Sequence, residues 1–221
     1  MKTSQYIGKT RNRGVNYWAD GDDHRIYIVA RHWLYALNAD TGRLFPTFGR
    51  PGKSISANLG RHARNITITS TTPRASSIRD QLIMSVLVSE GLPSAPGHIR
   101  SFDARTGQMR WIFHTIPQPG EPGYETWPKN AYQYTGGANN WSGITIDVSR
   151  GIVFVPTGSA AFDFYGSNRA GDNLYANTLL ALNANNRPAP LALPVRQPRH
   201  LGSRLPRPAQ PRHRQTRRQV C

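Results

Sequence analysis

The sequence predicts an all-β fold, a partial β-propeller of about three blades. Eight short runs rich in β-branched and aromatic residues are each bounded by Asp, Asn, Gly or Pro, which is the pattern of short strands joined by turns. No segment of helical length carries an apolar stripe. Three of the runs end in the same way, and internal repetition of this kind is typical of propellers.

The expected strands have the lengths that are common in globular proteins. In chain order they are Arg25–Ala30, Trp33–Leu37, Gln81–Val88, Ile99–Phe102, Met109–His114, Gly143–Asp147, Gly151–Pro156 and Thr178–Asn183.

The repeated ending is an Asp or Asn followed by a short turn, in LYALNADTG, IRSFDARTG and LLALNANN. We expect the Asp or Asn side chain to cap the turn and the Gly to take the positive φ that closes it. The three copies begin their turns at Asn38, Asp103 and Asn183, which is too wide a spacing for bare four-stranded blades, so loops must be inserted. A propeller closes with several blades, and the chain is therefore predicted to be a fragment with open sheet edges.

The stretch Gly120–Gly143 is predicted to be a long functional loop, because it has neither a strand nor a helix period. Its Gly-Gly-Ala-Asn-Asn-Trp run, Gly136–Trp141, lets the backbone approach another group closely and presents one large flat ring. Such a ring suits a planar ligand. The competing interpretation is that Trp127 and Trp141 both plug the end of a hydrophobic core.

The net charge of +16 suggests a nucleic-acid or membrane-surface binder, but the charge is concentrated at one end. Residues 187–221 hold nine Arg and no Asp or Glu, which leaves 16 − 9 = +7 on the rest. We therefore divide the chain into a propeller fragment at 1–186 and an Arg- and Pro-rich tail at 187–221, expected to be disordered. Nucleic acid is not an expected partner.

The tail has the composition of a translation read out of frame. Of the 34 residues from Pro188 to Cys221, 25 are Leu, Pro, His, Gln or Arg, which share codons beginning with C. Codons chosen to encode residues 185–206 give KTGRRLWHFQFVNHDIWDRDFP once their third base is deleted. That product supplies a Thr-Gly turn followed by a Trp-containing strand, as in the upstream copies.

The chain shows neither an apolar leader segment nor a run of apolar residues long enough to span a bilayer. Its single cysteine is Cys221, so an intrachain disulfide and a cysteine-based metal site are both excluded.

The residues resemble the dehydrogenases that use pyrroloquinoline quinone (PQQ), the quinoprotein glucose and alcohol dehydrogenases. The resemblance covers nearly all of Asn12–Ala184 and is specific because its motifs occur in the family's order. They are Asn12–Trp18, the x-Thr-Gly-x-x-x-Trp turn, Glu125–Pro128, Gly136–Trp141, Pro156–Ser159 and Gly171–Asn177. It implies an eight-bladed propeller with PQQ and Ca²⁺ near the axis.

The resemblance also implies roles for single residues. Trp141 matches the ring on which the quinone stacks, Arg13 the arginine that bonds the reactive quinone carbonyl, and Thr72 a hydroxyl that contacts the cofactor. Glu90 aligns with a carboxylate that binds Ca²⁺, and Ser159 stands where the alcohol dehydrogenases have an Asn calcium ligand. A solvated arginine at position 13 and an ordinary surface glutamate at position 90 are the alternatives.

Two departures from the family pattern matter. Ser159, together with Ile7 and Gly8 in place of vicinal cysteines, brings the chain nearer the glucose-dehydrogenase-like branch. The family's catalytic base lies in a His-Asp-x-Trp-Asp motif, which occurs here only as HDIWD in the restored frame. No catalytic residue is therefore expected in the chain as written, which is predicted to be inactive.

The implied activity is oxidation of a sugar or alcohol hydroxyl by hydride transfer to the quinone. Electrons would pass to a quinone or cytochrome, and the full-length protein would be periplasmic or associated with a membrane. The alternative is a non-enzymatic propeller-like module whose basic tail binds nucleic acid or anionic lipid.

Overall fold

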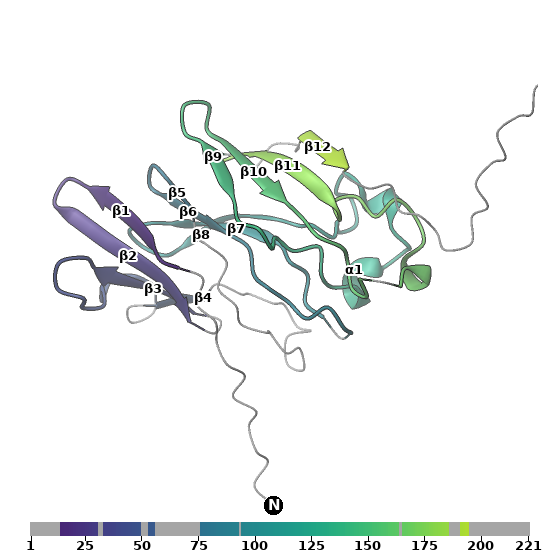
Figure 1. The fold of residues 1–221 in the computed structure, drawn as a ribbon, viewed down its shortest axis with the longest axis horizontal. Helices are drawn as coiled ribbons and strands as arrows, with labels where there is room; N and C mark the ends of the chain where they lie inside the picture. Colours follow the sequence, from purple (N-terminus) through teal and green to yellow (C-terminus); the bar gives the residue numbers. More distant parts are fainter. Residues whose placement is uncertain are drawn as a thin grey trace, which may run out of the picture.

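Three four-stranded antiparallel sheets follow one another along the chain (Figure 1). The computed structural model describes residues 14–30, 33–49, 53–55, 76–92, 94–163, 165–185 and 191–194. The first sheet contains β1 (Asn16–Asp20), β2 (Asp23–Ala30), β3 (Trp33–Asn38) and β4 (Lys53–Ile55). The middle sheet contains β5 (Ser76–Ile78), β6 (Gln81–Met84), β7 (Ile99–Asp103) and β8 (Met109–Phe113). The third contains β9 (Thr145–Asp147), β10 (Ile152–Pro156), β11 (Thr178–Asn183) and β12 (Leu191–Pro194).

Within each sheet the strands are hydrogen-bonded in chain order, so each sheet is a simple meander. The first strands of neighbouring sheets approach each other, since β1 contacts β5 and β5 contacts β9. This is the arrangement of propeller blades, in which the innermost strands gather on one side. The predicted all-β, three-blade architecture is confirmed.

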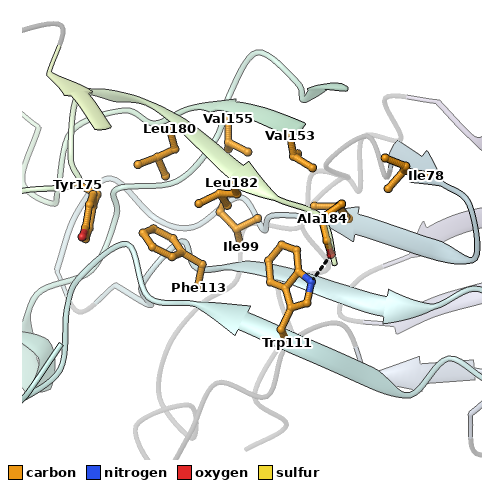
Figure 2. Packing of buried hydrophobic residues seen from close by; sticks show 11 residues of the cluster. Ile78, Ile99, Trp111, Phe113, Val153, Val155, Tyr175, Leu180, Leu182 and Ala184 are labelled. Carbon is orange, nitrogen blue, oxygen red and sulfur yellow. Dashed lines mark hydrogen bonds between the residues drawn. The ribbon is translucent and has the colours of Figure 1, made fainter. Parts of the chain in front are cut away.

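The sheets pack face to face through two apolar clusters. Between the first and middle sheets lie ten buried residues, among them Tyr27, Leu34, Leu82 and Phe102. Between the middle and third sheets lies the cluster in Figure 2, in which Trp111 and Phe113 meet Leu180 and Leu182. The middle sheet is buried on both faces, whereas β10 and β11 alternate buried with half-buried positions. The two outer sheets therefore each keep one open face.

The repeated turns are capped as the sequence predicts. The Oδ1 atom of Asn38 accepts from the amides of Asp40 (3.1 Å) and Thr41 (2.8 Å) and from the Thr41 hydroxyl (2.9 Å). Asp103 makes the same three contacts, at 2.9, 2.7 and 2.9 Å. The closing Gly42 and Gly107 have φ of 69° and 70°. Because a side chain strains this backbone, glycine is the favoured residue there.

All eight expected strands are present, and the one expected over 81–88 ends at Met84. The sequence did not predict β1, β4, β5 or β12. Two of these, β4 and β5, are only three residues long, too short for alternation to be recognised.

The prediction of disorder is wrong for four residues of the tail. Leu191–Pro194 pairs with β11 from Ala181↔Leu191 to Thr178↔Pro194. The outer edge of β11 would otherwise leave its peptide groups unpaired, and the alternating Leu-Ala-Leu run can supply a strand. The remainder of 187–221 lies outside the described residues.

Candidate functional site

The loop between β8 and β9 is the longest irregular segment among the described residues, and it packs at the end of the sheets beside the β10–β11 connection (Figure 1). It contains a 3₁₀ turn at Tyr124–Thr126 and a single helical turn, α1 (Ala131–Tyr134). A second 3₁₀ turn, Ser167–Arg169, lies in the facing connection.

Trp127 anchors this loop. Its side chain is only 5% exposed, and it packs in a small apolar cluster with Ile116, Ala138 and Ala176. Its indole Nε1 donates to the carbonyl of Leu174 in the β10–β11 connection. The core-plug interpretation is therefore correct for Trp127.

The two glycines of the Gly136–Trp141 run let the main chain approach two other main-chain segments closely. A Cβ added to Gly136 would lie 2.2 Å from the carbonyl oxygen of Ser94, and one added to Gly137 would lie 2.6 Å from the amide of Ala161. The run is held on both sides by backbone bonds, from Gly97 N to Gly137 O (2.7 Å) and from Ala138 N to the carbonyl of residue 159 (2.8 Å). Only glycine fits at these two positions. The segment before Trp141, residues 136–140, is thereby held rigidly, and we call it the glycine clamp.

Trp141 follows this clamp and faces outward. It is 42% exposed, so the core-plug interpretation is wrong for this residue. Gly158 lies directly beside it, since a Cβ there would be 3.1 Å from the indole Cδ1 and 3.4 Å from Nε1. The ring thus lies against a backbone segment that carries no side chain, and part of it faces the solvent.

The two asparagines before Trp141 have different environments. Both polar atoms of the Asn140 side chain are hydrogen-bonded. Its Nδ2 donates to the carbonyls of Gly143 (2.8 Å) and Pro156 (2.7 Å), and its Oδ1 accepts from the Gly143 backbone amide (2.9 Å). Asn139 is buried, yet its Nδ2 has no hydrogen-bond partner. A buried donor without a partner is costly, and an acceptor oxygen that reached it would remove that cost.

Ser159 lies on the segment that touches this clamp. Its Oγ donates to the side-chain Oδ1 of Asn177 (3.2 Å). The backbone amide of Asn177 donates to the backbone carbonyl of Gly158 (2.9 Å). The structure therefore brings Ser159 and Trp141 to the same clamp and adds the amide oxygen of Asn177 beside the serine.

Glu90 is exposed and lines an open pocket with Gly91, Phe162, Asp163 and Tyr165. Partial burial and then the negative charge of Glu90 raise the pKa of Asp163, while the Arg169 cation opposes them. Two carboxylates thus lie close enough to interact. Among the described residues no group of three or more His, Cys, Asp or Glu side chains could hold a metal.

Arg13 and Thr72 lie outside the described residues, so their roles stay predictions. Sequence reasoning missed Asn139 and Asp163. Asn139 stood inside a recognised motif but resembles its neighbour Asn140. Both side chains are buried, and the missing hydrogen-bond partner of the Asn139 Nδ2 distinguishes the two.

Comparison with known proteins identifies the family. A family model described as PQQ: glucose/ethanol/alcohol dehydrogenase, beta-propeller domain, matches residues 1–186. The chain belongs to this family. It is 31% identical over 154 residues to a quinate/shikimate dehydrogenase (quinone) of Acinetobacter baylyi, with 68% of this chain and 19% of the relative covered. It is 27% identical to the quinoprotein glucose dehydrogenase of Escherichia coli, over 83% of this chain and 24% of that protein.

Solved structures of alcohol and methanol dehydrogenases show the same fold. A quinohemoprotein alcohol dehydrogenase from Comamonas testosteroni superposes with a TM-score of 0.62 at 24% identity, over 81% of this chain and 27% of that one. A europium-containing methanol dehydrogenase gives 0.60 at 22% identity, over 79% and 30%. The chain spans about a fifth to a quarter of the length of the curated relatives above.

Within the described part of the chain, no helix is long and apolar enough to span a membrane.

Proposed function

We propose that this chain is the quinone-binding part of a PQQ- and Ca²⁺-dependent dehydrogenase that oxidises a hydroxyl group of a sugar or an alcohol. The supporting observation is Trp141, an exposed indole held by a rigid glycine clamp against Gly158. The membership of the family supplies the identity of the planar ligand.

The residues of the clamp would bind and orient the cofactor. The face of Trp141 offers a stacking surface, worth about 1–3 kcal/mol for an aromatic ligand. The unpartnered Nδ2 of Asn139 would donate a hydrogen bond to an oxygen at the edge of the ligand. When bound, PQQ supplies the acceptor for the hydride that leaves the hydroxyl-bearing carbon of the substrate.

The residues present also suit a hard cation. Ca²⁺ prefers carboxylate and neutral oxygen ligands. Glu90 with Asp163 offers the first kind, and the hydroxyl of Ser159 with the amide oxygen of Asn177 offers the second. We assign Ca²⁺ to these residues.

The proton of the substrate hydroxyl must pass to a base, and we place that base in the HDIWD of the restored reading frame. A carboxylate in this position would accept the proton as general base. The chain as written lacks that base, so it should bind the cofactor without turning over a substrate. Electrons would leave the complete enzyme, periplasmic or membrane-associated, through a quinone or a cytochrome.

The test is binding of PQQ to the 221-residue chain, measured by equilibrium dialysis with Ca²⁺ present. Trp141→Ala should weaken binding by about 5- to 150-fold, which corresponds to the loss of about 1–3 kcal/mol of stacking. Tyr134→Ala, which removes another exposed aromatic ring, should leave binding unchanged. Equal affinity of the Trp141 variant and the parent would contradict the proposal.

A further inference from the structure

Two histidines lie opposite each other where the long β8–β9 loop begins. His98 directly precedes β7 and His114 directly follows β8. These antiparallel strands pair Ile99 with Phe113, and this register brings the two histidines together. Their rings meet edge to face, with centroids 4.6 Å apart and 69° between the planes. His98 is 7% exposed and the side chain of His114 is 16% exposed. Neither residue belongs to the candidate cofactor or calcium site.

The ring of His98 holds the start of the loop. Its Nδ1 accepts a hydrogen bond from the backbone amide of Thr115, at 3.1 Å. An Nδ1 atom that accepts carries no proton, so the ring is neutral and its single proton lies on Nε2. A second proton would have to bind Nδ1 itself. Because a backbone amide can only donate, two donors would then face each other and the bond to Thr115 would be lost.

The surroundings of His98 also disfavour a charged ring. Arg100 lies two residues further along the strand, is buried, and donates from its guanidinium to the backbone carbonyl of His98 at 3.0 Å. Burial first, and then the charges of Arg100 and His114, lower the pKa of His98 well below its ordinary value of about 6.5. Within the described part of the chain, these two residues are the charged groups that act on His98.

His114 makes a contact that suits either charge state of its ring. Its Nδ1 lies 2.8 and 3.0 Å from the two carboxylate oxygens of Glu121, which also accepts from the backbone amide of Gln118 at 2.9 Å. A second proton on the ring would leave the bond to the carboxylate in place. The side-chain amide of Gln118, 3.4 Å from Nε2, is exposed and can turn its oxygen toward a charged ring. Of the two histidines, only His98 has a buried bond that protonation must break.

The backbone at His98 also supports the glycine clamp. The amide of Gly97 donates to the carbonyl of Gly137 (2.7 Å), and a Cβ added to Gly97 would lie 2.1 Å from the Cβ of Asn139. The hydroxyl of Ser85 donates to the carbonyl of Gly97 at 3.1 Å. Residues 97 and 98 therefore contact the clamp through their backbone and the start of the loop through the imidazole.

We infer that His98 makes an acid-sensitive contact that holds the β8–β9 loop. The neutral ring binds the Thr115 amide, whereas a proton on Nδ1 releases residues 114–121 and loosens the adjoining clamp. The three sheets stay folded, because the two apolar clusters between them contain neither a carboxylate nor a histidine.

The direction of the effect follows from proton binding. The held ring has a lowered pKa, so the released ring binds a proton more readily. The contact is therefore fully formed above about pH 6.5 and weakens as the pH falls from there toward the lowered pKa. For a released ring with a pKa of about 6.5, release becomes about tenfold easier between about pH 7.5 and about pH 5.5.

The test is hydrogen–deuterium exchange of the 221-residue chain over this pH range, corrected for the intrinsic pH dependence of amide exchange. The parent should lose about tenfold of its protection in residues 114–121, and protection in residues 136–140 should fall with it, whereas β10 should stay protected. His98→Asn should abolish this loss, because the amide oxygen can accept from Thr115 and the side chain does not titrate.

Two histidine variants are the matched controls. His24→Asn removes a partly exposed histidine of β2 in the first sheet and should behave like the parent. His114→Asn keeps a donor for Glu121 and should also retain the loss of protection. The parent alone provides a further measurement, since nitrogen NMR shifts of the His98 ring should show a single proton on Nε2 at about pH 7.5 and a second proton appearing together with the loss of protection.

Four outcomes would overturn the inference. They are a charged His98 ring at about pH 7.5, protection that does not depend on pH, an equal loss in the His98 variant and the parent, and a loss that either control variant abolishes. Simultaneous loss of protection in β10 would show general acid unfolding and overturn it as well. None of these measurements requires PQQ or Ca²⁺, so the outcome is independent of the proposed function.

Discussion

The capped turn at Asp103 should stabilise the middle sheet measurably. One carboxylate oxygen accepts three hydrogen bonds, from the amides of Arg105 and Thr106 and from the Thr106 hydroxyl. The other carboxylate oxygen accepts from Arg110 at 2.6 Å. Asp103→Ala removes all four bonds, whereas Asp103→Asn can keep the three turn bonds, as Asn38 does in the first sheet.

The size of the loss follows from these contacts. A hydrogen bond contributes about 0.5–1.5 kcal/mol net, so three of them contribute about 2–4 kcal/mol. The ion pair adds little, at most about 1 kcal/mol, because Arg110 is a third exposed and also pairs with Asp80 at 2.5 Å. We therefore expect Asp103→Ala to cost about 2–4 kcal/mol of unfolding free energy and Asp103→Asn at most about 1 kcal/mol.

The measurement is urea unfolding followed by circular dichroism, with Asp172→Ala as a control that deletes an exposed carboxylate. Desolvation alone would raise the pKa of Asp103, but hydrogen bonds from Arg110 and Thr106 outweigh it and lower the pKa. The charged form therefore stabilises the fold above the carboxyl's ordinary pKa, and this advantage over Asp103→Asn should fade as the pH falls through the lowered pKa. Equal stability of the Ala and Asn variants would refute the assignment of the stabilisation to the turn.

Three further predictions concern the core and the candidate site. Arg100→Leu should stabilise the chain by about 1–4 kcal/mol at pH 7. Burial of the arginine is unfavourable, as its pKa, lowered to about 10, indicates, and Leu180 holds the equivalent position in the third sheet. A lower urea midpoint of the variant would contradict this. Trp127→Ala should cost about 3–5 kcal/mol while Trp141→Ala costs less than about 0.5 kcal/mol, and similar losses in urea unfolding would contradict the distinction. Added Ca²⁺ should raise the melting temperature of the parent and of Asp172→Asn but not of Glu90→Gln, and an equal rise in all three would remove Glu90 from the metal site.

Much of the fold was predictable because strands and turns are local. The cap at Asn38 or Asp103 uses residues within four positions of one another, so its sequence pattern predicts its geometry. The candidate site was only partly predictable, because burial of a side chain depends on segments far apart in the chain. Trp127 and Trp141 lie in the same loop, yet Trp127 packs in a buried apolar cluster and donates to the carbonyl of Leu174, whereas Trp141 is exposed.

Strand β12 bears on the reading-frame hypothesis. Counted from the capping residues Asp103 and Asn183, position 191 is equivalent to Trp111 and position 193 to Phe113. The chain has Leu191 and Leu193 there, which lie exposed, whereas the restored frame KTGRRLWHFQ places a Trp and a Phe at these two positions. With the codons chosen above, the shifted frame therefore has the Trp-x-Phe pattern of β8 in the register that the structure assigns to β12. Sequencing the gene around codon 185 should show a reading frame that continues through HDIWD into further Thr-Gly-x-x-x-Trp turns, and a stop codon within a few codons of the repaired position would remove this explanation of the tail.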